Sequence, residues 1–326
     1  MKLIVGSICF NEAQKIGEVL DNIPKKINGI DEIETVVLDD GSTDDTARIA
    51  VQKGAKLIKN GKRKRLPYSF PVLVDYFLEN GADLAVNIDG DMQFYPKEIP
   101  LLLEPILKGE ADFVAADRFT NPKTGKKRKG KDMPMGKYLG NRLGSWILSV
   151  LTGHSFSDVT CGFRAYNRKA LLNINLNGKY TYTQETFQAL AMKKLNIKNV
   201  PISITYFKNR KSRVVENGIF SYMLKSAAGI LIAFRDFAPM KFFGLLGLFL
   251  AVPGILMMGF VGVHYLKTES FSPYISVGAI GIYLFTIAIL SWIVGLLADM
   301  LNRVTNNQEK ILLLAKKTYY ESKKDK

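Results

Sequence analysis

The sequence predicts an α/β domain with a mostly parallel sheet and helices on both faces, followed by membrane-associated helices. Three observations support this fold class. Short apolar runs alternate with helical patterns along the first part of the chain, and several of these runs end in acidic residues. Two later runs, 242–266 and 270–298, contain no Asp, Glu, Lys or Arg over 25 and 29 residues. Alternation of strands and helices is typical of parallel sheets, because each crossover between parallel strands needs a long connection.

The strand predictions depend on apolar runs bounded by turn residues, and they cover 2–8, 34–38, 55–58, 83–88 and 113–116. The helix predictions depend on apolar residues at spacings of three and four. They cover 16–23, which Pro24 ends, and then 44–53, 68–80, 136–151 and part of 180–195. Ser42 or Thr43 is a candidate cap for the second of these helices.

Acidic residues follow three of the predicted strands. Glu12, Asp39 and Asp89 each lie just past a strand end, and ligands of such sheets bind at the carboxyl ends of strands. We therefore expect the three carboxylates to face one crevice. In the run Asp89-Gly90-Asp91-Met92-Gln93, the glycine lets the chain bend, so that three oxygen ligands suited to Mg²⁺ or Mn²⁺ can converge. Taken alone, this run is equally typical of an acidic turn.

Composition limits the class of protein. The chain has 326 residues and a net charge of +15, which indicates an anionic partner: nucleic acid, a membrane surface or a phosphorylated substrate. No basic motif interleaved with aromatic residues is present, so nucleic acid is the least favoured of these. The two cysteines are far apart in the sequence, which fits a reducing compartment and gives no disulfide framework.

Four motifs in order resemble those of family 2 glycosyltransferases, which have the GT-A (Rossmann-like) fold. They are Phe10-Asn11-Glu12, Val37 to Asp44, Asp89 to Gln93, and Ser157 to Ala165. The last one resembles the acceptor-side motif of the polyprenyl-phosphate branch, which contains dolichyl-phosphate mannose synthase and undecaprenyl-phosphate glycosyltransferases. The resemblance covers roughly residues 3–215, and the four motifs together are specific.

The resemblance implies a donor site. Glu12 is expected to contact the ribose and Asp39 the base, while Asp89, Asp91 and Gln93 hold the cation and the diphosphate. Asp91 is also expected to be catalytic. The donor-binding residues expected in this way are Ile8, Phe10, Glu12, Val37, Asp39, Asp40, Lys62, Asp89 and Gly90. The chain departs from the family at Ile8, where proline is usual, and at Arg63, which replaces the last glycine of a Gly-Lys-Gly.

The resemblance also implies an acceptor side. Arg118, just past a predicted strand, and Lys137, at the start of a predicted helix, are expected to bind the acceptor phosphate and to be catalytic. Lys and Arg both suit phosphate, and Arg can bind it through two nitrogens. Arg210 and Arg213, in a late basic motif that lacks the family's usual glycine, are further candidates. The lysine-rich run 123–131 is typical of a solvated loop, which we expect to lie near anionic lipid.

Glu185 has two open interpretations. It follows Gln184 early in a predicted helix, where the helix dipole favours a carboxylate. It could equally lie near the transferred sugar. The two histidines, His154 and His264, have no partner in the sequence pattern, and we expect both to be structural.

The two uncharged runs each exceed the roughly 20 residues that span a bilayer as a helix. The connector 267–269 has one basic residue and the tail after the second run has seven, so the positive-inside rule predicts that both ends face the cytoplasm. Before the first run, 219–237 is expected to be an amphipathic helix in the membrane interface. The expected organisation is a catalytic domain at 1–215, a juxtamembrane helix at 216–240, a transmembrane hairpin at 241–299 and a basic cytoplasmic tail at 300–326.

These observations predict an inverting, metal-dependent glycosyltransferase of the cell membrane with two spans and a cytoplasmic catalytic domain. It would move one sugar from a UDP- or GDP-sugar to a polyprenyl phosphate. The alternatives are a family 2 enzyme acting on another cell-envelope acceptor, and a non-catalytic basic membrane scaffold. The scaffold interpretation does not explain three aligned acidic strand ends. The sugar, the nucleotide, the polyprenol and the oligomeric state, including a homo-oligomer, stay open.

Overall fold

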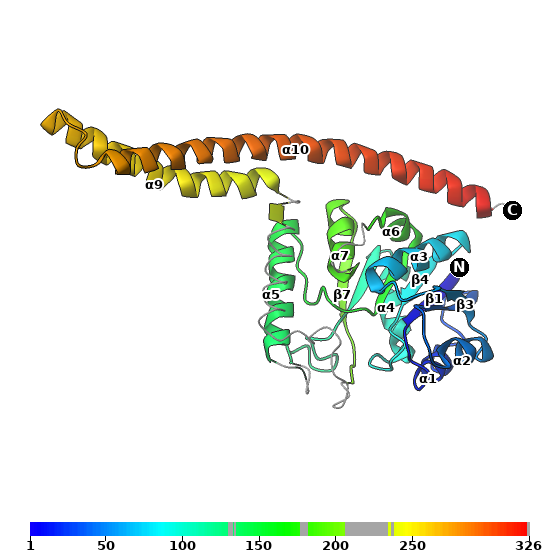
Figure 1. The fold of residues 1–326 in the computed structure, drawn as a ribbon. Helices are drawn as coiled ribbons and strands as arrows, with labels where there is room; N and C mark the ends of the chain where they lie inside the picture. The colour runs from blue at the N-terminus through cyan, green and yellow to red at the C-terminus, as the bar shows by residue number, and fades with distance from the viewer. Residues whose placement is uncertain (130–132, 134, 177–181, 206–233, 236–237, 325–326) are drawn as a thin grey trace. The chain divides into compact units, whose positions relative to one another are not determined.

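The computed structural model describes residues 1–129, 133, 135–176, 182–205, 234–235 and 238–324. Its first part alternates strands and helices, as Figure 1 shows. The elements are β1 (Lys2–Cys9), α1 (Ile16–Asp21), β2 (Glu32–Asp39), α2 (Thr46–Gln52), β3 (Lys56–Lys59), α3 (Leu66–Glu79), β4 (Leu84–Asn87), η1 (Pro96–Glu98), α4 (Ile99–Leu107), β5 (Phe113–Asp117), α5 (Met135–Thr152), β6 (Arg164–Asn167), α6 (Arg168–Asn173), α7 (Tyr182–Met192), β7 (Ile197–Pro201), α9 (Pro239–Thr268) and α10 (Ile275–Lys324).

The described strands form one seven-stranded sheet in the order β3-β2-β1-β4-β6-β5-β7. Strand β6 is antiparallel to both of its neighbours, β4 and β5, whereas the other pairs in the sheet are parallel. The carboxyl ends of β1, β2, β4 and β5 therefore share one edge with the amino end of β6. The segment that enters β6 reaches the same edge as the acidic strand ends.

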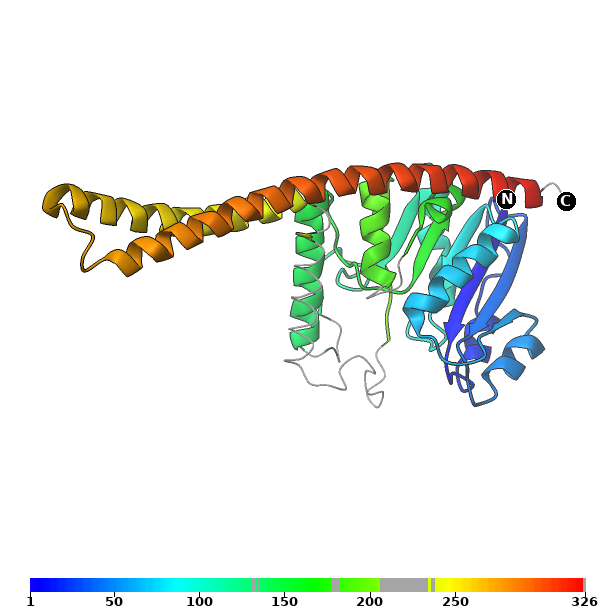
Figure 2. The ribbon, with the colours of Figure 1, turned by 45° about the horizontal axis from the view of Figure 1, so that its top comes forward.

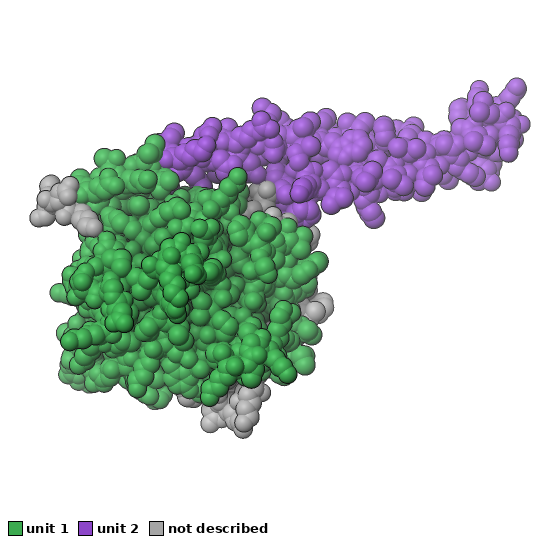
Figure 3. Space-filling model, turned by 180° about the vertical axis from the view of Figure 1, so that it is seen from behind, with its two compact units in different colours: residues 1–226, 313–326 green, residues 227–312 purple. Residues whose placement is uncertain are grey.

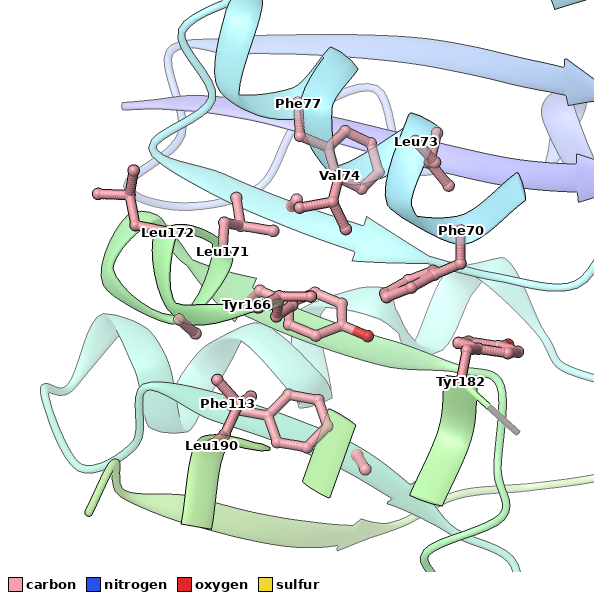
Figure 4. Packing of buried hydrophobic residues seen from close by; sticks show 14 of the residues in the cluster. Phe70, Leu73, Val74, Phe77, Phe113, Tyr166, Leu171, Leu172, Tyr182 and Leu190 are labelled. Carbon is pink, nitrogen blue, oxygen red and sulfur yellow. The ribbon is translucent and has the colours of Figure 1, made fainter. Parts of the chain in front are cut away.

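Helices cover both faces of the sheet (Figure 2). On one face, α3, α6 and α7 contribute Phe70, Leu171 and Phe187 to a buried cluster, part of which Figure 4 shows. On the other face, α1 and α4 contribute Val19 and Leu102 to a second cluster. The predicted mostly parallel sheet with helices on both faces is confirmed.

Some elements were not among the sequence predictions. They are α4, β6, α6 and β7. Strand β6 has only four residues and begins with a charged one, Arg164, so its local pattern does not indicate a buried strand. Its pairing between β4 and β5 comes from long-range contacts. The predicted interfacial helix at 219–237 lies almost entirely outside the described residues.

The chain divides into two compact units, which are coloured separately in Figure 3. Unit 2, residues 227–312, contains α9 and most of α10, and both helices are long and apolar enough to cross a membrane. The two helices meet through small residues. A Cβ on Gly254 would come within 2.9 Å of the Gly281 carbonyl oxygen, and the reverse holds for Gly281. Such close contact between glycines is typical of helices that pack in lipid.

Unit 1 contains residues 1–226 and 313–326, and therefore includes the last turns of α10, which ends at Lys324. Tyr320 is almost fully buried in the first cluster, and its hydroxyl donates to Asp75 Oδ1 of α3 at 2.9 Å. Lys323 pairs with Glu79 of the same helix at 2.9 Å. The segment expected to be a basic tail is therefore helical as far as Lys324, and its end packs on the α/β domain.

Candidate active site

The first two strand ends are tied together by hydrogen bonds. Asn11, in the left-handed conformation at φ 54°, donates its N–H to Ser42 Oγ at 2.9 Å, and its Oδ1 accepts from the Thr43 N–H at 2.8 Å. The N–H of Glu12 donates to Thr46 Oγ1 at 2.8 Å. The turn after β1 is thus held against the turn after β2, which positions Glu12 beside the start of α2.

Three carboxylates lie around the end of β1. Burial raises the pKa of the Cys9 thiol to about 12, and the nearby charges of Glu12, Asp89 and Asp39 add to that rise. Cys9 pairs with Asp39 in the register of β1 and β2, and a Cβ on Gly90, the residue after Asp89, would come within 2.5 Å of Cys9 Sγ. The structure therefore brings the residues at the ends of β1, β2 and β4 to one place, as the strand-end argument predicts.

Asp39 and Asp40 have different surroundings. Asp39 Oδ1 accepts from the Ser42 N–H at 2.9 Å. Both oxygens of Asp40 accept from the segment after β3: Oδ1 from Asn60 Nδ2 at 2.8 Å and the Lys64 N–H at 3.0 Å, and Oδ2 from the Arg65 N–H at 2.8 Å. Burial opposes the ionisation of Asp40, but these bonds and one from Ser69 hold its pKa below the usual range.

Asp40 therefore shapes the basic loop 60–65, which carries the candidate Lys62. The loop backbone lies directly on Gly41, at φ 82°, because a Cβ there would meet the Arg63 nitrogen at 2.7 Å. The Arg63 guanidinium lies 4.1 Å from the centre of the Phe10 ring. The loop after β3 is in this way attached to the ends of both β1 and β2. Arg63 stands where the family usually has glycine, and its contact with Phe10 could not be predicted from that difference in sequence.

In the motif after β4, Gly90 and Asp89 each lie in close contact with a residue from another part of the chain. A Cβ on Gly90 would come within 2.5 Å of Cys9 Sγ, so only glycine fits there. A Cβ on Gly162 would come within 2.9 Å of both carboxylate oxygens of Asp89, so that carboxylate lies against the backbone just before β6. Met92 at φ 59° reverses the chain, and Asp91 Oδ1 accepts from the Gln93 N–H at 3.0 Å.

The described residues contain no group of three or more His, Cys, Asp or Glu side chains arranged to hold a metal ion. Asp89 and Asp91 offer two carboxylates, and Gln93 offers one amide oxygen. Mg²⁺ usually takes one or two protein carboxylates and completes its shell with waters and substrate phosphates. The oxygen donors of this motif therefore fit a cation that a diphosphate substrate helps to bind.

Arg118 follows β5 and is almost fully buried. Its Nε donates to Asp158 Oδ2 at 2.6 Å and its Nη2 donates to Asp158 Oδ1 at 3.0 Å and to the Thr160 hydroxyl. Burial opposes the ionisation of Asp158, but Arg118 and the bonds from Thr160 hold its pKa below the usual range. The guanidinium predicted to bind phosphate is thus oriented by a buried carboxylate in the Ser157 to Ala165 motif.

Asp89 lies close to the Ser157 to Ala165 motif as well as to its own. Burial raises the pKa of the Cys161 thiol to about 12, and this thiol is close enough to Arg118, Asp158 and Asp89 for their charges to act on it. Asp89 therefore lies near Cys9 on one side and near the segment that holds Arg118 on the other. Asp158 and Gly162 belong to a motif that the sequence shows, but their roles could not be predicted, because their partners are distant in the sequence.

The remaining candidates are distributed as follows. Val37 is fully buried in the second cluster, so its side chain supports β2, and Ile8 packs against the first cluster. Lys137 lies in the first turn of α5. Glu185 lies in the first turn of α7. Arg210 and Arg213 lie outside the described residues.

The sheet covered by helices on both faces, with acidic residues after its strands, is a GT-A-like fold. The model of glycosyl transferase family 2 matches residues 5–174, and the chain belongs to this family. Solved structures show the same fold: glucosyl-3-phosphoglycerate synthase from Mycobacterium tuberculosis, in complex with Mn²⁺, UDP-glucose and phosphoglyceric acid, has a TM-score of 0.54 and 21% identity. That match covers 71% of this chain and 79% of the synthase.

Several relatives are named for lipid-phosphate acceptors. The UDP-N-acetylglucosamine–dolichyl-phosphate N-acetylglucosaminyltransferase of Methanococcus voltae is 29% identical over 63% of this chain and 86% of its own length. The dolichyl-phosphate hexose transferase of Haloferax volcanii is 31% identical over 59% of this chain and 78% of its own length. Glycosyltransferase AglJ of the same organism is 23% identical over 92% of this chain and 94% of its own length, so that similarity extends into the C-terminal helices.

Proposed function

We propose that the protein transfers one sugar from a nucleotide diphosphate sugar to a polyprenyl phosphate at the cytoplasmic face of a membrane. The observation that carries the proposal is the position of Asp89. Its carboxylate lies on Gly162, in the segment whose Asp158 and Thr160 hold Arg118. A donor diphosphate at the acidic motif and an acceptor phosphate near Arg118 would then be neighbours. The relatives that act on dolichyl phosphate support the choice of acceptor.

The chemistry needs no strong base in the protein. A phosphomonoester has a second pKa near ~6, so the acceptor oxygen is largely ionised at neutral pH. That oxygen forms a bond to the anomeric carbon while the bond from this carbon to the diphosphate breaks, and the nucleoside diphosphate leaves with the electron pair. A single displacement of this kind inverts the anomeric centre. The protein supplies position and charge, which account for most of catalysis in such transfers.

Each group of residues has a role in this proposal. Glu12 and Asp39 bind the nucleoside, and the loop 60–65 with Lys62 closes the donor side. A Mg²⁺ or Mn²⁺ ion held by Asp89, Asp91 and Gln93 would neutralise charge on the leaving diphosphate. Arg118 orients the acceptor phosphate, with Lys137, Arg210 and Arg213 as further contributors. Helices α9 and α10 keep the enzyme at the bilayer, where the acceptor lipid is found.

The test is direct. Full-length protein in membranes is incubated with labelled UDP-glucose, UDP-N-acetylglucosamine and GDP-mannose, together with a short-chain polyprenyl phosphate and Mn²⁺, and the lipid fraction is extracted. We expect one donor to label the lipid, and we expect Asp91→Asn to abolish that label. Label that appears only in water-soluble products with every donor would contradict the proposed acceptor.

A further inference from the structure

Arg164 is the largest fully buried side chain of the described residues. It is the basic residue of the Ser157 to Ala165 motif, which resembles an acceptor-side motif. The structure gives it a different position. It opens β6, at the sheet edge that also carries the ends of β1, β4 and β5, but none of its side-chain surface is exposed. Arg164 therefore does not reach a substrate directly.

The guanidinium of Arg164 is held by backbone carbonyls. Nε donates to the Cys161 oxygen at 2.7 Å, and Nη2 donates to the oxygens of Thr183 at 2.9 Å and Val159 at 3.3 Å. None of the salt bridges among the described residues includes this guanidinium, and the polar side chain beside it is the buried hydroxyl of Tyr166.

Aromatic rings surround the same group. The ring centres of Phe187, Tyr182 and Phe113 lie 5.2, 5.5 and 5.7 Å from the guanidinium carbon. Figure 4 shows Phe113, Tyr166 and Tyr182 in this cluster. A cation over aromatic faces is partly stabilised by their charge distribution. A buried cation without a carboxylate is nevertheless costly, and a methionine of similar volume would avoid that cost. The position therefore calls for an explanation beyond packing.

The bonded carbonyls show what Arg164 connects. Val159 and Cys161 lie on either side of Thr160, whose hydroxyl accepts from Arg118. Thr183 belongs to the first turn of α7, one residue before Gln184. One guanidinium thus joins the segment that orients Arg118 to the helix start beside it. On the facing strand, Asn87 Nδ2 donates to the Gly162 oxygen at 2.9 Å, so the backbone under Asp89 is held as well.

We infer that Arg164 is a positioning residue for the transfer step. It fixes the backbone from Val159 to Cys161 against α7, so that Arg118 presents its guanidinium to the acceptor phosphate at a constant distance from Asp89. The inference rests on the proposed function, because it explains how Arg118, the residue proposed to bind the acceptor phosphate, is held in place relative to Asp89. A guanidinium is needed, since its Nε and Nη2 donate to these carbonyls from two separate nitrogens in a rigid plane, whereas a lysine has its three N–H groups on a single nitrogen.

The experiment compares Arg164→Lys and Arg164→Met with a matched control, Arg168→Met, in the full-length protein in membranes. Arg168 is the first residue of α6, directly after the other end of β6, and its Nη1 donates to the Ala82 carbonyl oxygen at 3.3 Å, away from the acidic strand ends. We expect both Arg164 variants to lose about ten- to a hundredfold in kcat for the polyprenyl phosphate, the size of one lost charge-assisted contact in the transition state. Donor affinity should change by less than about twofold, since the nucleoside contacts are untouched. Arg168→Met should keep kcat.

A double-mutant cycle with Arg118→Ala separates positioning from a general loss of folding. If Arg164 acts through Arg118, the double variant should be no slower than Arg118→Ala alone by more than about twofold. Multiplied losses in the double variant, or a kcat per folded molecule that is normal in both Arg164 variants, would overturn the inference. If Arg164→Met fails to fold, the same double-mutant cycle is measured with Arg164→Lys. Failure of the proposed function is distinguishable, because the wild-type protein itself would then label no lipid.

Discussion

The ion pair between Arg118 and Asp158 allows a quantitative prediction. Asp158 has no exposed surface and the Arg118 side chain is 10% exposed, with nitrogen–oxygen distances of 2.6 and 3.0 Å. Removing one partner of a buried pair leaves the other charge uncompensated and costs about 3 to 5 kcal/mol. Asp158→Asn keeps the shape and some of the hydrogen bonds, so we expect the lower end, about 3 kcal/mol of unfolding free energy at pH 7.

The assay is thermal unfolding of the solubilised full-length protein, followed by a signal from the α/β domain. For a unit of this size, the loss corresponds to a fall of roughly 6 to 12 °C in Tm. Lys169→Ala is the matched control, because its pair with Asp112 at 3.1 Å has a lysine side chain that is 63% exposed. Exposed pairs contribute about 0 to 1 kcal/mol, so this variant should unfold within a few degrees of wild type.

The pH dependence has a definite sign. The folded-state pKa of Asp158 is depressed, so the ion pair stabilises the protein above the unfolded-state value of about 3.9. That stability is lost as the pH falls through the depressed folded-state value. The difference between wild type and Asp158→Asn should therefore be constant from pH 7 to about pH 4 and should narrow below it. An equal Tm for the two proteins at neutral pH would refute the role of the buried pair.

Four further predictions follow from the same structure. Asp91→Asn should abolish transfer without lowering Tm, since Asp91 is partly exposed; normal turnover at saturating Mn²⁺ would exclude it as a metal ligand. Asp39→Ala should weaken donor binding more than it slows bound substrate, which calorimetry with the nucleotide would detect or contradict. Tyr320→Phe should cost about 1 kcal/mol of unfolding free energy by removing the bond to Asp75, whereas the exposed Tyr319→Phe should cost little, and equal values would argue against docking of the end of α10. Protease added outside right-side-out vesicles should reach only the connector around 267–272; digestion of the α/β domain would reverse the proposed orientation.

Local patterns in the sequence determined much of this protein. Apolar runs located β1 to β5, and uncharged runs located the apolar helices, because both signals depend only on neighbouring residues. The proximity of the acidic strand ends could be predicted from the sequence for a general reason: in a parallel sheet, the carboxyl ends of the strands share one edge. That rule predicted from the sequence alone that Glu12, Asp39 and Asp89 lie near one another.

Only the tertiary structure decided which charged side chains are buried and hold neighbouring segments in place. Asp40 holds the loop after β3, Asp158 orients Arg118, and Arg164 lies inside an aromatic cluster, and the sequence predicted none of these contacts. Their partners are distant along the chain: Asp158, for example, comes 40 positions after Arg118. The short antiparallel β6 and the packing of Tyr320 on α3 were hidden for the same reason. Burial and pairing are properties of the assembled fold, and a local sequence pattern does not contain them.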